Sequence, residues 1–240
     1  MRNFKLTIEY DGTDFYGWQI QLDRMTVQGE LYRAFRELSG GELKIIGAGR
    51  TDAGVHAVGQ VANVRLETDL SPTVVERAVN AKLPSSIFVR SVEEAHPSFN
   101  ARFDARSRTY HYIFIRRPTA LWRRYFHLAA GELDLRAIRS ALRMIIGDND
   151  FSSFASSADA NPSKRCKVIE AGLTDSPPLV VIAVTADHFL HNMVRALAGT
   201  LLEIGRGKPL DMGEVIEACD RSAAGPTLPP NALYLMEVRY

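Results

Sequence analysis

The sequence predicts an α+β protein made of two similar halves. The chain has 240 residues, enough to bury a hydrophobic core as one large domain or two small ones. In each half, segments that alternate like strands are separated by segments whose apolar residues have helical spacing. We therefore expect two ferredoxin-like halves related by pseudo-symmetry, residues 1–104 and 105–240, with antiparallel sheets, helices on one face and an active-site cleft between the halves.

The first half follows the order β-α-β-β-α-β. Thr26 and Ser71 carry hydroxyl groups of the kind that cap helix N-termini, and Pro72 suits the first helical position. The expected strands are residues 4–10, 43–48, 58–66 and 87–92, and the expected helices are residues 27–38 and 72–83.

The second half begins with a long strand in which aromatic and polar residues alternate. Asp134 is expected to cap a helix that Gly147 ends. A loop is expected at residues 148–154, and no sequence-level repeat accompanies the repeated pattern. The expected strands are residues 106–117, 164–173, 179–185 and a final strand ending at Tyr240; the expected helices are residues 135–146, 189–204 and 211–219.

The composition argues against several classes of protein. Apolar residues make up 46% and charged residues 24% of the chain, as in an ordinary globular protein. No apolar run approaches the ~18–20 residues that span a bilayer, and residues 1–10 alternate like a strand rather than a signal peptide. Cys166 and Cys219 form no CxxC pair. We therefore expect a cytoplasmic protein without a disulfide framework or a structural zinc site.

The net charge of +1 says little about partners, but the use of arginine is informative. Of the 29 basic residues, 23 are arginine, whose planar guanidinium suits phosphate and base edges. Residues 102–124 hold seven arginines and a single acid, Asp104, interleaved with aromatic residues. Cations beside stackable rings are typical of surfaces that bind single-stranded or looped RNA. A solvated strand face would show the same composition, so both interpretations stay open at this point.

The strongest chemical signal is at residues 47–57, Gly-Ala-Gly-Arg-Thr-Asp-Ala-Gly-Val-His-Ala, which follow an expected strand. The three glycines permit a tight turn or the close approach of a ligand. A dinucleotide-binding loop is excluded because Asp52 stands where that motif needs a glycine, and because a strand rather than a helix is expected next. A phosphate-binding P-loop is excluded because no Gly-Lys-Ser/Thr sequence ends the segment.

Asp52 is the candidate reactive group of this segment. Arg50 lies two residues away, and a nearby guanidinium keeps a carboxylate ionised and available as a nucleophile. A structural turn pair between Arg50 and Asp52 would use the same two residues. The spacing alone leaves both possibilities open.

The string GRTDAGVHA at residues 49–57 closely resembles the active-site motif of the TruA branch of the tRNA pseudouridine synthases. Five further blocks resemble the family in the same order, so the resemblance extends over nearly the whole chain. Two departures are Asn192, where a second histidine is expected, and Leu228, where a small residue is common; neither is expected to touch the chemistry. The further blocks are YDGT with FYGWQ (10–19), FNARFDARSRTYHY (99–112), DFSSF (150–154), FLHNMVR (189–195) and AGPT (224–227).

This resemblance implies a function. Members of the family isomerise uridine to pseudouridine at nucleotides 38 to 40 of the tRNA anticodon stem-loop. The reaction breaks the N-glycosidic bond, turns the uracil and rejoins it through carbon 5. The resemblance also implies a homodimer that binds tRNA and requires no cofactor and no metal, since there is neither a redox change nor an external group transfer.

The resemblance assigns roles to individual residues as well. Asp52 corresponds to the nucleophile, and whether it attacks the ribose or the uracil is left open. Tyr110 corresponds to the residue that stacks on the detached base and helps to remove the proton from carbon 5, and Arg195 to the arginine that orients the carboxylate. Arg50 is expected to fill the space of the extruded nucleotide or to grip a phosphate. The expected substrate-binding residues are Tyr110, Arg50, Thr51 and Arg108.

Structural explanations of the same residues remain. Tyr110 on an alternating strand would ordinarily be assigned to packing, and Arg195 in an apolar helix to a structural ion pair. A non-catalytic RNA-binding module would account for the basic stretch, although it has no need of the Asp52 carboxylate. His188 and His191 lack a third ligand at useful spacing, so no metal site is expected there.

Overall fold

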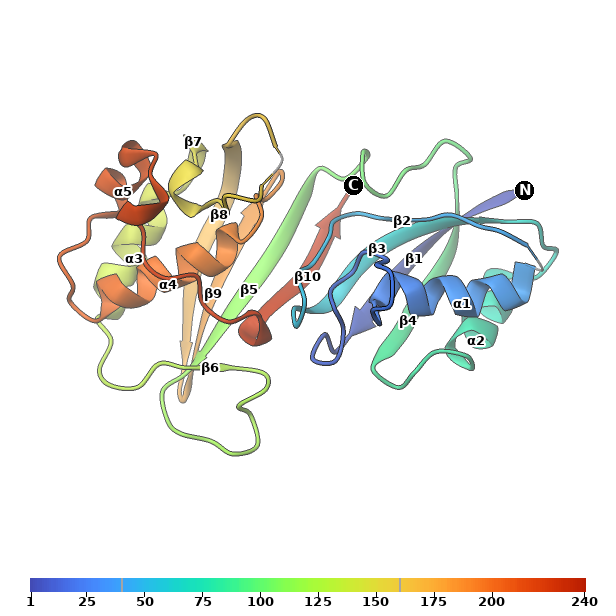
Figure 1. Cartoon of the computed structure of the whole chain (residues 1–240), viewed down its shortest axis with the longest axis horizontal. Helices are drawn as coiled ribbons and strands as arrows, with labels where there is room; N and C mark the ends of the chain where they lie inside the picture. The colour runs from blue at the N-terminus through green and yellow to red at the C-terminus, as the bar shows by residue number, and fades with distance from the viewer. Residues whose placement is uncertain (40, 160) are drawn as a thin grey trace. The chain divides into compact units, whose positions relative to one another are not determined.

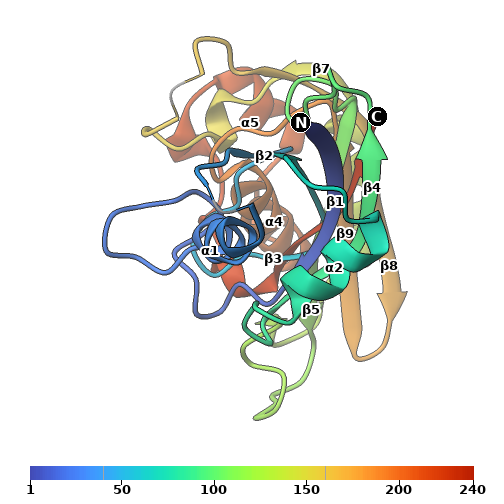
Figure 2. The same cartoon turned by 90° about the vertical axis from the view of Figure 1, so that its right-hand side faces the viewer.

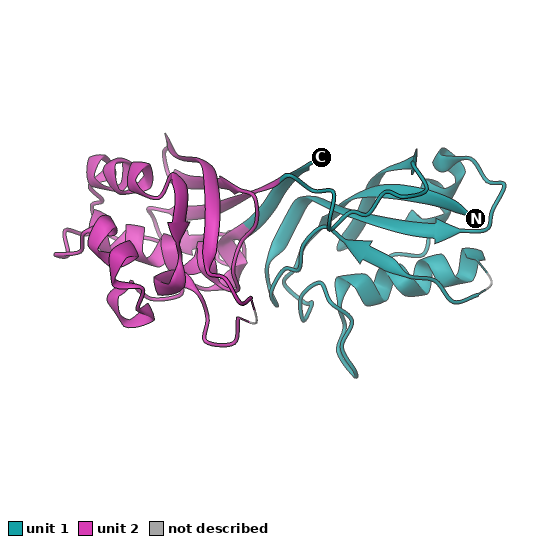
Figure 3. Cartoon of the chain, turned by 90° about the horizontal axis from the view of Figure 1, so that it is seen from above, with its two compact units in different colours: residues 1–106, 234–240 teal, residues 107–233 magenta. Residues whose placement is uncertain are grey.

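The computed structural model describes residues 1–39, 41–159 and 161–240. The chain divides into two compact units, residues 1–106 with 234–240 and residues 107–233 (Figure 3). The first unit contains the expected β-α-β-β-α-β half and also the last strand of the chain. This division differs from the expected one at 104/105 because the C-terminal strand pairs with a strand of the first unit.

The first unit is a sheet with two helices (Figure 1). Its elements are β1 (Arg2–Tyr10), α1 (Val27–Ser39), β2 (Ile45–Gly47), β3 (His56–Leu66), α2 (Pro72–Asn80), β4 (Ile87–Ala95) and β10 (Leu233–Arg239). The strands lie in the order β4-β1-β3-β10, with β2 paired to β3. The pairings are antiparallel except that Tyr234 of β10 lies in parallel register with His56 of β3.

One face of this sheet carries the core of the unit. Alternation along β1 buries Phe4, Leu6 and Ile8 completely, whereas Lys5 and Thr7 on the other face stay partly exposed. Helix α2 packs against β4 and α1. The helices bury Leu31, Phe35, Val75 and Val79 in this core.

The second unit has the same kind of α+β architecture. Its elements are β5 (Ser107–Ile115), β6 (His127–Leu128), α3 (Leu135–Met144), β7 (Gly147–Asp150), β8 (Arg165–Ser176), β9 (Leu179–Ala186), α4 (Met193–Gly205) and α5 (Met212–Ala218), with short 3-10 turns at 152–154, 221–223 and 230–232. The strand order is β5-β9-β8-β7, all antiparallel, with β6 added in parallel to β5. Helix α3 packs on α4 and on β8, which lies beside β9 (Figure 2).

Three of the expected helix starts are confirmed by their capping contacts. The Thr26 hydroxyl accepts a hydrogen bond from Gly29 N at 3.2 Å, and the Ser71 hydroxyl accepts one from Val74 N. The Asp134 carboxylate accepts from Arg136 N and Ala137 N at the start of α3. Each cap satisfies an N–H group that the first helical turn leaves without a partner.

Two expectations for the second unit are wrong. The expected loop at 148–154 is strand β7 followed by a 3-10 turn, because residues 147–150 pair with β8. The helix expected from residue 189 begins only at Met193. Asn192 adopts a left-handed backbone with φ of 67°, through which a right-handed helix does not continue. None of the helices in the described ranges is long and apolar enough to cross a membrane.

Candidate active site

The loop that carries Asp52 connects β2 to β3 and is held by the segment that follows β1. Trp18 N donates to the carbonyl oxygen of Thr51 at 3.0 Å, and Gly54 N donates to that of Phe15 at 3.2 Å. These two backbone hydrogen bonds lie on either side of Asp52 and fix the path of the loop at both points.

Two glycines allow this contact between the segments. A Cβ atom at Gly12 would lie 2.0 Å from the carbonyl oxygen of Val55, and one at Gly17 would lie 2.6 Å from that of Thr51. Gly17 also has a φ of 84°, in the left-handed region that favours glycine. The YDGT and FYGWQ blocks therefore have a structural role, because they bring the chain against the Asp52 loop without side-chain interference.

Thr51 anchors the loop from inside the unit. Its side chain is buried, and its hydroxyl lies 2.7 Å from the hydroxyl of Tyr10. Burial raises the pKa of Tyr10 to about 12, although hydrogen bonds with Thr51 and Gln60 act in the opposite direction. Gln60 in turn donates to the carbonyl oxygen of Gly49 at 3.0 Å. The Thr51 hydroxyl is thus used within the protein rather than presented at the surface.

Asp52 and Arg50 differ in their exposure. Asp52 is half-buried, and its carbonyl oxygen accepts from Val55 N at 3.2 Å in a tight turn that includes Gly54 at φ 79°. Arg50 is exposed and forms no ion pair with any residue that the structure describes. The structural Arg50–Asp52 turn pair considered above is therefore absent, and the Arg50 guanidinium is presented to solvent.

His56, in the same motif, was not assigned a role from the sequence. Its Nδ1 accepts a hydrogen bond from Gly12 N at 3.0 Å, and its ring stacks on Tyr234 with centroids 4.8 Å apart. The Asp11 carboxylate oxygen Oδ1 also lies 3.1 Å from His56 Nδ1, and this contact is an ion pair when the imidazole is protonated. His56 therefore links the Asp52 loop to the segment after β1 and to β10.

The second unit carries Tyr110, Arg108 and Arg195. Tyr110 lies in β5 opposite Val184 of β9, is 8% exposed and packs edge-on against Phe189 with ring centroids 5.0 Å apart. Arg108, two residues earlier on the same strand, donates from Nη1 to the carbonyl oxygen of Asp187 at 2.8 Å.

Arg195 lies in the first turn of α4 and contacts both residues that depart from the family pattern. Its Nε donates to the carbonyl oxygen of Leu228 at 2.8 Å, and its Nη1 donates to Asn192 Oδ1 at 2.6 Å. The backbone N–H of Leu228 also donates to the Arg195 carbonyl oxygen at 3.2 Å. The expectation that Asn192 and Leu228 would not touch the candidate chemistry is therefore wrong, because both are hydrogen-bonded to one of its residues.

The connection from β9 to α4 contacts all three candidate residues of the second unit. Asp187 accepts from Arg108, Phe189 packs on Tyr110, and Asn192 accepts from Arg195. Arg50, Thr51 and Asp52 belong to the first unit, so the structure groups the six candidate residues into two sets. Periodicity did not indicate the role of this connection, because residues 189–192 were assigned to a regular helix.

Comparison with known proteins identifies the family of the chain that carries these two sets of residues. A sequence model described as tRNA pseudouridine synthase matches residues 6–104 and 141–240. A tRNA pseudouridine synthase A of Caldicellulosiruptor saccharolyticus is 41% identical over 245 residues, covering 100% of both chains. One of Geobacillus sp. is also 41% identical over 245 residues, covering 100% of this chain and 98% of its own.

The chain belongs to the tRNA pseudouridine synthase family. It is therefore an isomerase that acts on tRNA, as the resemblance implied. The ranges matched by the family model contain Asp52 and Arg195, whereas Tyr110 and Arg108 lie between them.

Two other features of this pseudouridine synthase do not form a second reactive centre. Cys166 Sγ lies 3.4 Å from His188 Nε2, and His188 Nδ1 lies 2.9 Å from Asp187 Oδ1, an order that resembles a nucleophilic triad. Burial raises the pKa of the Cys166 thiol to about 12, and Asp187 acts in the same direction, so the thiol stays protonated and is a poor nucleophile. Among the described residues no group of three or more potential ligands could hold a metal.

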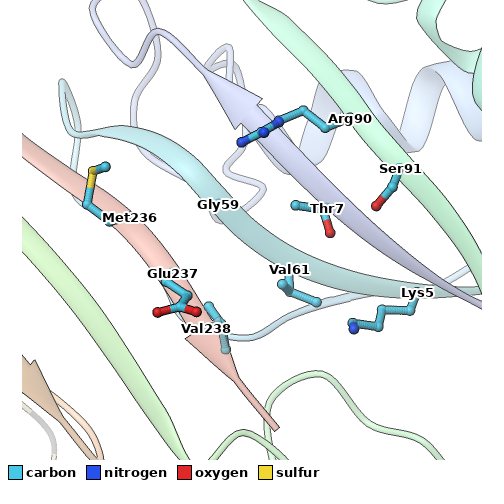
Figure 4. A pocket seen from close by; sticks show the side chains of 9 residues that line it. All are labelled: Lys5, Thr7, Gly59, Val61, Arg90, Ser91, Met236, Glu237 and Val238. Atoms are coloured by element: carbon cyan, nitrogen blue, oxygen red, sulfur yellow. The ribbon is translucent and has the colours of Figure 1, made fainter.

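A pocket of about 320 Å³ lies on the sheet of the first unit (Figure 4). None of the candidate site residues lines it. Its two cations already have acidic neighbours, because Lys5 Nζ lies 3.9 Å from a Glu93 carboxylate oxygen and Arg90 Nε lies 3.9 Å from one of Glu9. The pocket therefore does not present unpaired charge to a phosphate.

Proposed function

We propose that the chain isomerises uridines 38, 39 and 40 of the tRNA anticodon stem-loop, with Asp52 as the nucleophile. The observation that carries this proposal is the fixed loop around Asp52. Its flanking residues are hydrogen-bonded to the segment after β1, while Asp52 itself is only half-buried. A carboxylate held in this way is pre-organised for attack, because little ordering is left to occur when substrate binds.

The chemistry consists of four changes. The bond from the ribose to uracil N1 breaks, a bond from the ribose to carbon 5 forms, the hydrogen on carbon 5 leaves as a proton, and N1 gains a proton from solvent. Asp52 supplies the nucleophile, at the ribose or at the uracil. Tyr110 stacks against the detached base, and its hydroxyl receives or relays the proton. Arg195 orients the Asp52 carboxylate while the charges change.

Two of the three remaining candidates, Arg50 and Arg108, bind the substrate. The exposed guanidinium of Arg50 is suited to fill the space of an extruded nucleotide or to contact a phosphate. We propose that Arg108, whose side chain is held by the carbonyl oxygen of Asp187, contacts RNA through its guanidinium charge. Thr51, with its buried hydroxyl, supports the loop that carries the nucleophile.

The arginine-rich stretch provides part of an RNA-binding surface. Arg117, Arg123 and Arg124 are exposed and form no ion pair within the described residues. Trp122 is 48% exposed and stacks on Phe126, with centroids 5.8 Å apart. Unpaired cations beside an exposed ring favour the RNA interpretation of this stretch over that of a solvated face.

We also propose a cytoplasmic homodimer that acts without a cofactor or metal. Both cysteines are free thiols, which suits a reducing compartment. The dimer follows from the resemblance to the TruA branch. The isomerisation is redox-neutral and transfers no group from another molecule, so it requires no cofactor.

The test is tritium release from tRNA labelled at carbon 5 of uridine, using anticodon stem-loops that carry a single uridine at position 38, 39 or 40. We expect release from each and none from stem-loops without uridine at these positions. A non-catalytic RNA-binding module would bind the same RNA without releasing tritium, and release only from uridines elsewhere would contradict the proposed site.

A further inference from the structure

In the sequence, Asn192 lies between β9, which pairs with the strand of Tyr110, and α4, which carries Arg195. It occupies the N-cap position of α4, yet its side chain makes no hydrogen bond to a backbone N–H of the first helical turn. Asparagine at an N-cap ordinarily makes such a bond. Here Oδ1 accepts from Arg195 Nη1 at 2.6 Å instead.

We infer that Asn192 is a positioning residue that sets the orientation of the Arg195 guanidinium. This inference rests on the proposed role of Arg195 in orienting the nucleophile. The guanidinium is planar, and two of its nitrogens are held by different parts of the chain: Nη1 by Asn192 and Nε by the carbonyl oxygen of Leu228. Two bonds to two nitrogens of a rigid plane fix both its position and its rotation.

The left-handed backbone of Asn192 makes this contact possible. With φ of 67° and ψ of 0°, the residue turns the chain into α4, and its carbonyl oxygen accepts from Ala196 N at 3.0 Å. Asparagine, aspartate and histidine are the side chains that most readily adopt this conformation after glycine. A histidine at this position would place Nδ1 at the same bond separation from the backbone as Oδ1, so it keeps both the conformation and an acceptor.

The residue before Asn192 is held from outside the helix. The Asp159 side chain is 2% exposed, and its Oδ2 accepts from His191 N at 2.5 Å, while the His191 carbonyl oxygen accepts from Ser156 N at 3.0 Å. The same carboxylate accepts from Lys164 Nζ at 2.9 Å. Both backbone polar groups of His191 are thus fixed, which limits the movement of Asn192.

The segment that carries the second support of Arg195, the carbonyl oxygen of Leu228, is also held in place. A Cβ atom at Gly199 would lie 1.8 Å from the carbonyl oxygen of Pro226, and Gly225 N donates to the Thr200 hydroxyl at 2.9 Å. These contacts hold residues 225–228 against α4. Leu228 accepts the hydrogen bond from Arg195 with its backbone carbonyl oxygen. The size of the Leu228 side chain therefore does not decide this contact.

The test compares Asn192→Gly, which keeps the left-handed backbone and removes the amide, with Asn192→His, which restores an acceptor. In single-turnover assays with tRNA we expect Asn192→Gly to lower the rate of pseudouridine formation by about ten- to a hundredfold, because a hydrogen bond to a charged group is lost. Asn192→His should stay within about threefold of the parent, and tRNA affinity should stay within about threefold in both variants. A wild-type rate for Asn192→Gly, or an equal loss in Asn192→His, would overturn the inference.

A second readout is independent of catalysis. In the parent chain without RNA, the Nη resonances of Arg195, assigned with Arg195→Lys, should be separate and sharp because rotation of the guanidinium is restricted. In Asn192→Gly they should merge or broaden, and in Asn192→His they should stay separate. Unchanged resonances in Asn192→Gly would overturn the positioning role even if the chain proved inactive on tRNA. Inactivity of the parent with the expected resonances would instead contradict the proposed function alone.

Discussion

Trp18 donates its backbone N–H to the carbonyl oxygen of Thr51 at 3.0 Å, and this bond joins the segment after β1 to the residue directly before Asp52. Trp18 is itself 2% exposed, so the bond is anchored in the core of the first unit. The backbone of the Asp52 loop is therefore positioned by a segment that is distant in the sequence. This contact joins the FYGWQ block to the GRTDAGVHA block.

Replacing Asp52 with asparagine should abolish pseudouridine formation and leave tRNA affinity within about tenfold, or ~1.4 kcal/mol. Binding energy should come from many phosphate contacts, whereas the proposed nucleophile is a single group. Tritium release and filter binding with the same preparation measure the two quantities. Substantial turnover by Asp52→Ala protein would show that another residue attacks the nucleotide.

At Tyr110, removal of the hydroxyl and removal of the ring should have separable effects. Tyr110→Phe should bind RNA and be severely slowed, and Tyr110→Ala should be worse by a stacking contribution of roughly 1–3 kcal/mol. Single-turnover rates of both variants measure this difference. A wild-type rate for Tyr110→Phe would mean that the hydroxyl takes no part in proton transfer.

Gly12→Ala should damage both stability and activity. The added Cβ would meet the carbonyl oxygen of Val55 at 2.0 Å and push the Asp52 loop away, at a cost of about 1–3 kcal/mol. Thermal unfolding and tritium release measure the two effects. Gly172→Ala is the matched control, because a Cβ there meets nothing within 4 Å. Equal behaviour of the two variants would contradict the tight contact at Gly12.

The four arginines of residues 116–124 should differ in their contribution to RNA binding. Arg116 is already paired with Asp175 at 2.5 Å, whereas Arg117, Arg123 and Arg124 form no ion pair within the described residues. Changing each singly to glutamine should flatten the slope of log affinity against log salt by about one unit for at least one of the last three. Arg116→Gln is the internal comparison. Four slopes equal to that of the parent would place the RNA track elsewhere.

Stability should fall at alkaline pH through Tyr10. Burial raises the pKa of its hydroxyl from about 10 to about 12, so the folded state favours the neutral form. This contribution is fully present below pH 10 and is lost as the pH rises toward 12, at up to about 1.4 kcal/mol per pH unit. Denaturant unfolding at pH 8 to 11.5 should show a shallower loss for Tyr10→Phe than for the parent chain. Parallel pH curves would contradict the assigned shift.

Local sequence signals predicted most helices and strands correctly, and the two exceptions have different causes. Thr26, Ser71 and Asp134 cap the expected helices because capping depends on residues three positions apart. Strand β7 was missed because its four residues, Gly147–Asp150, are polar and are ordered by pairing with β8. The late start of α4 depends on the backbone of Asn192, which hydropathy does not report.

Residue types at short and regular spacing were enough to predict most of the helices and strands and the family, and to single out Asp52 as the candidate nucleophile. The folded chain was needed to show that Gly12 and Gly17 lie against the Asp52 loop, that Arg50 does not pair with Asp52, and that Asn192 accepts a hydrogen bond from Arg195. It also placed β10 with the first unit. These features depend on close approaches between distant segments and on backbone angles, and neither produces a periodic pattern in the sequence.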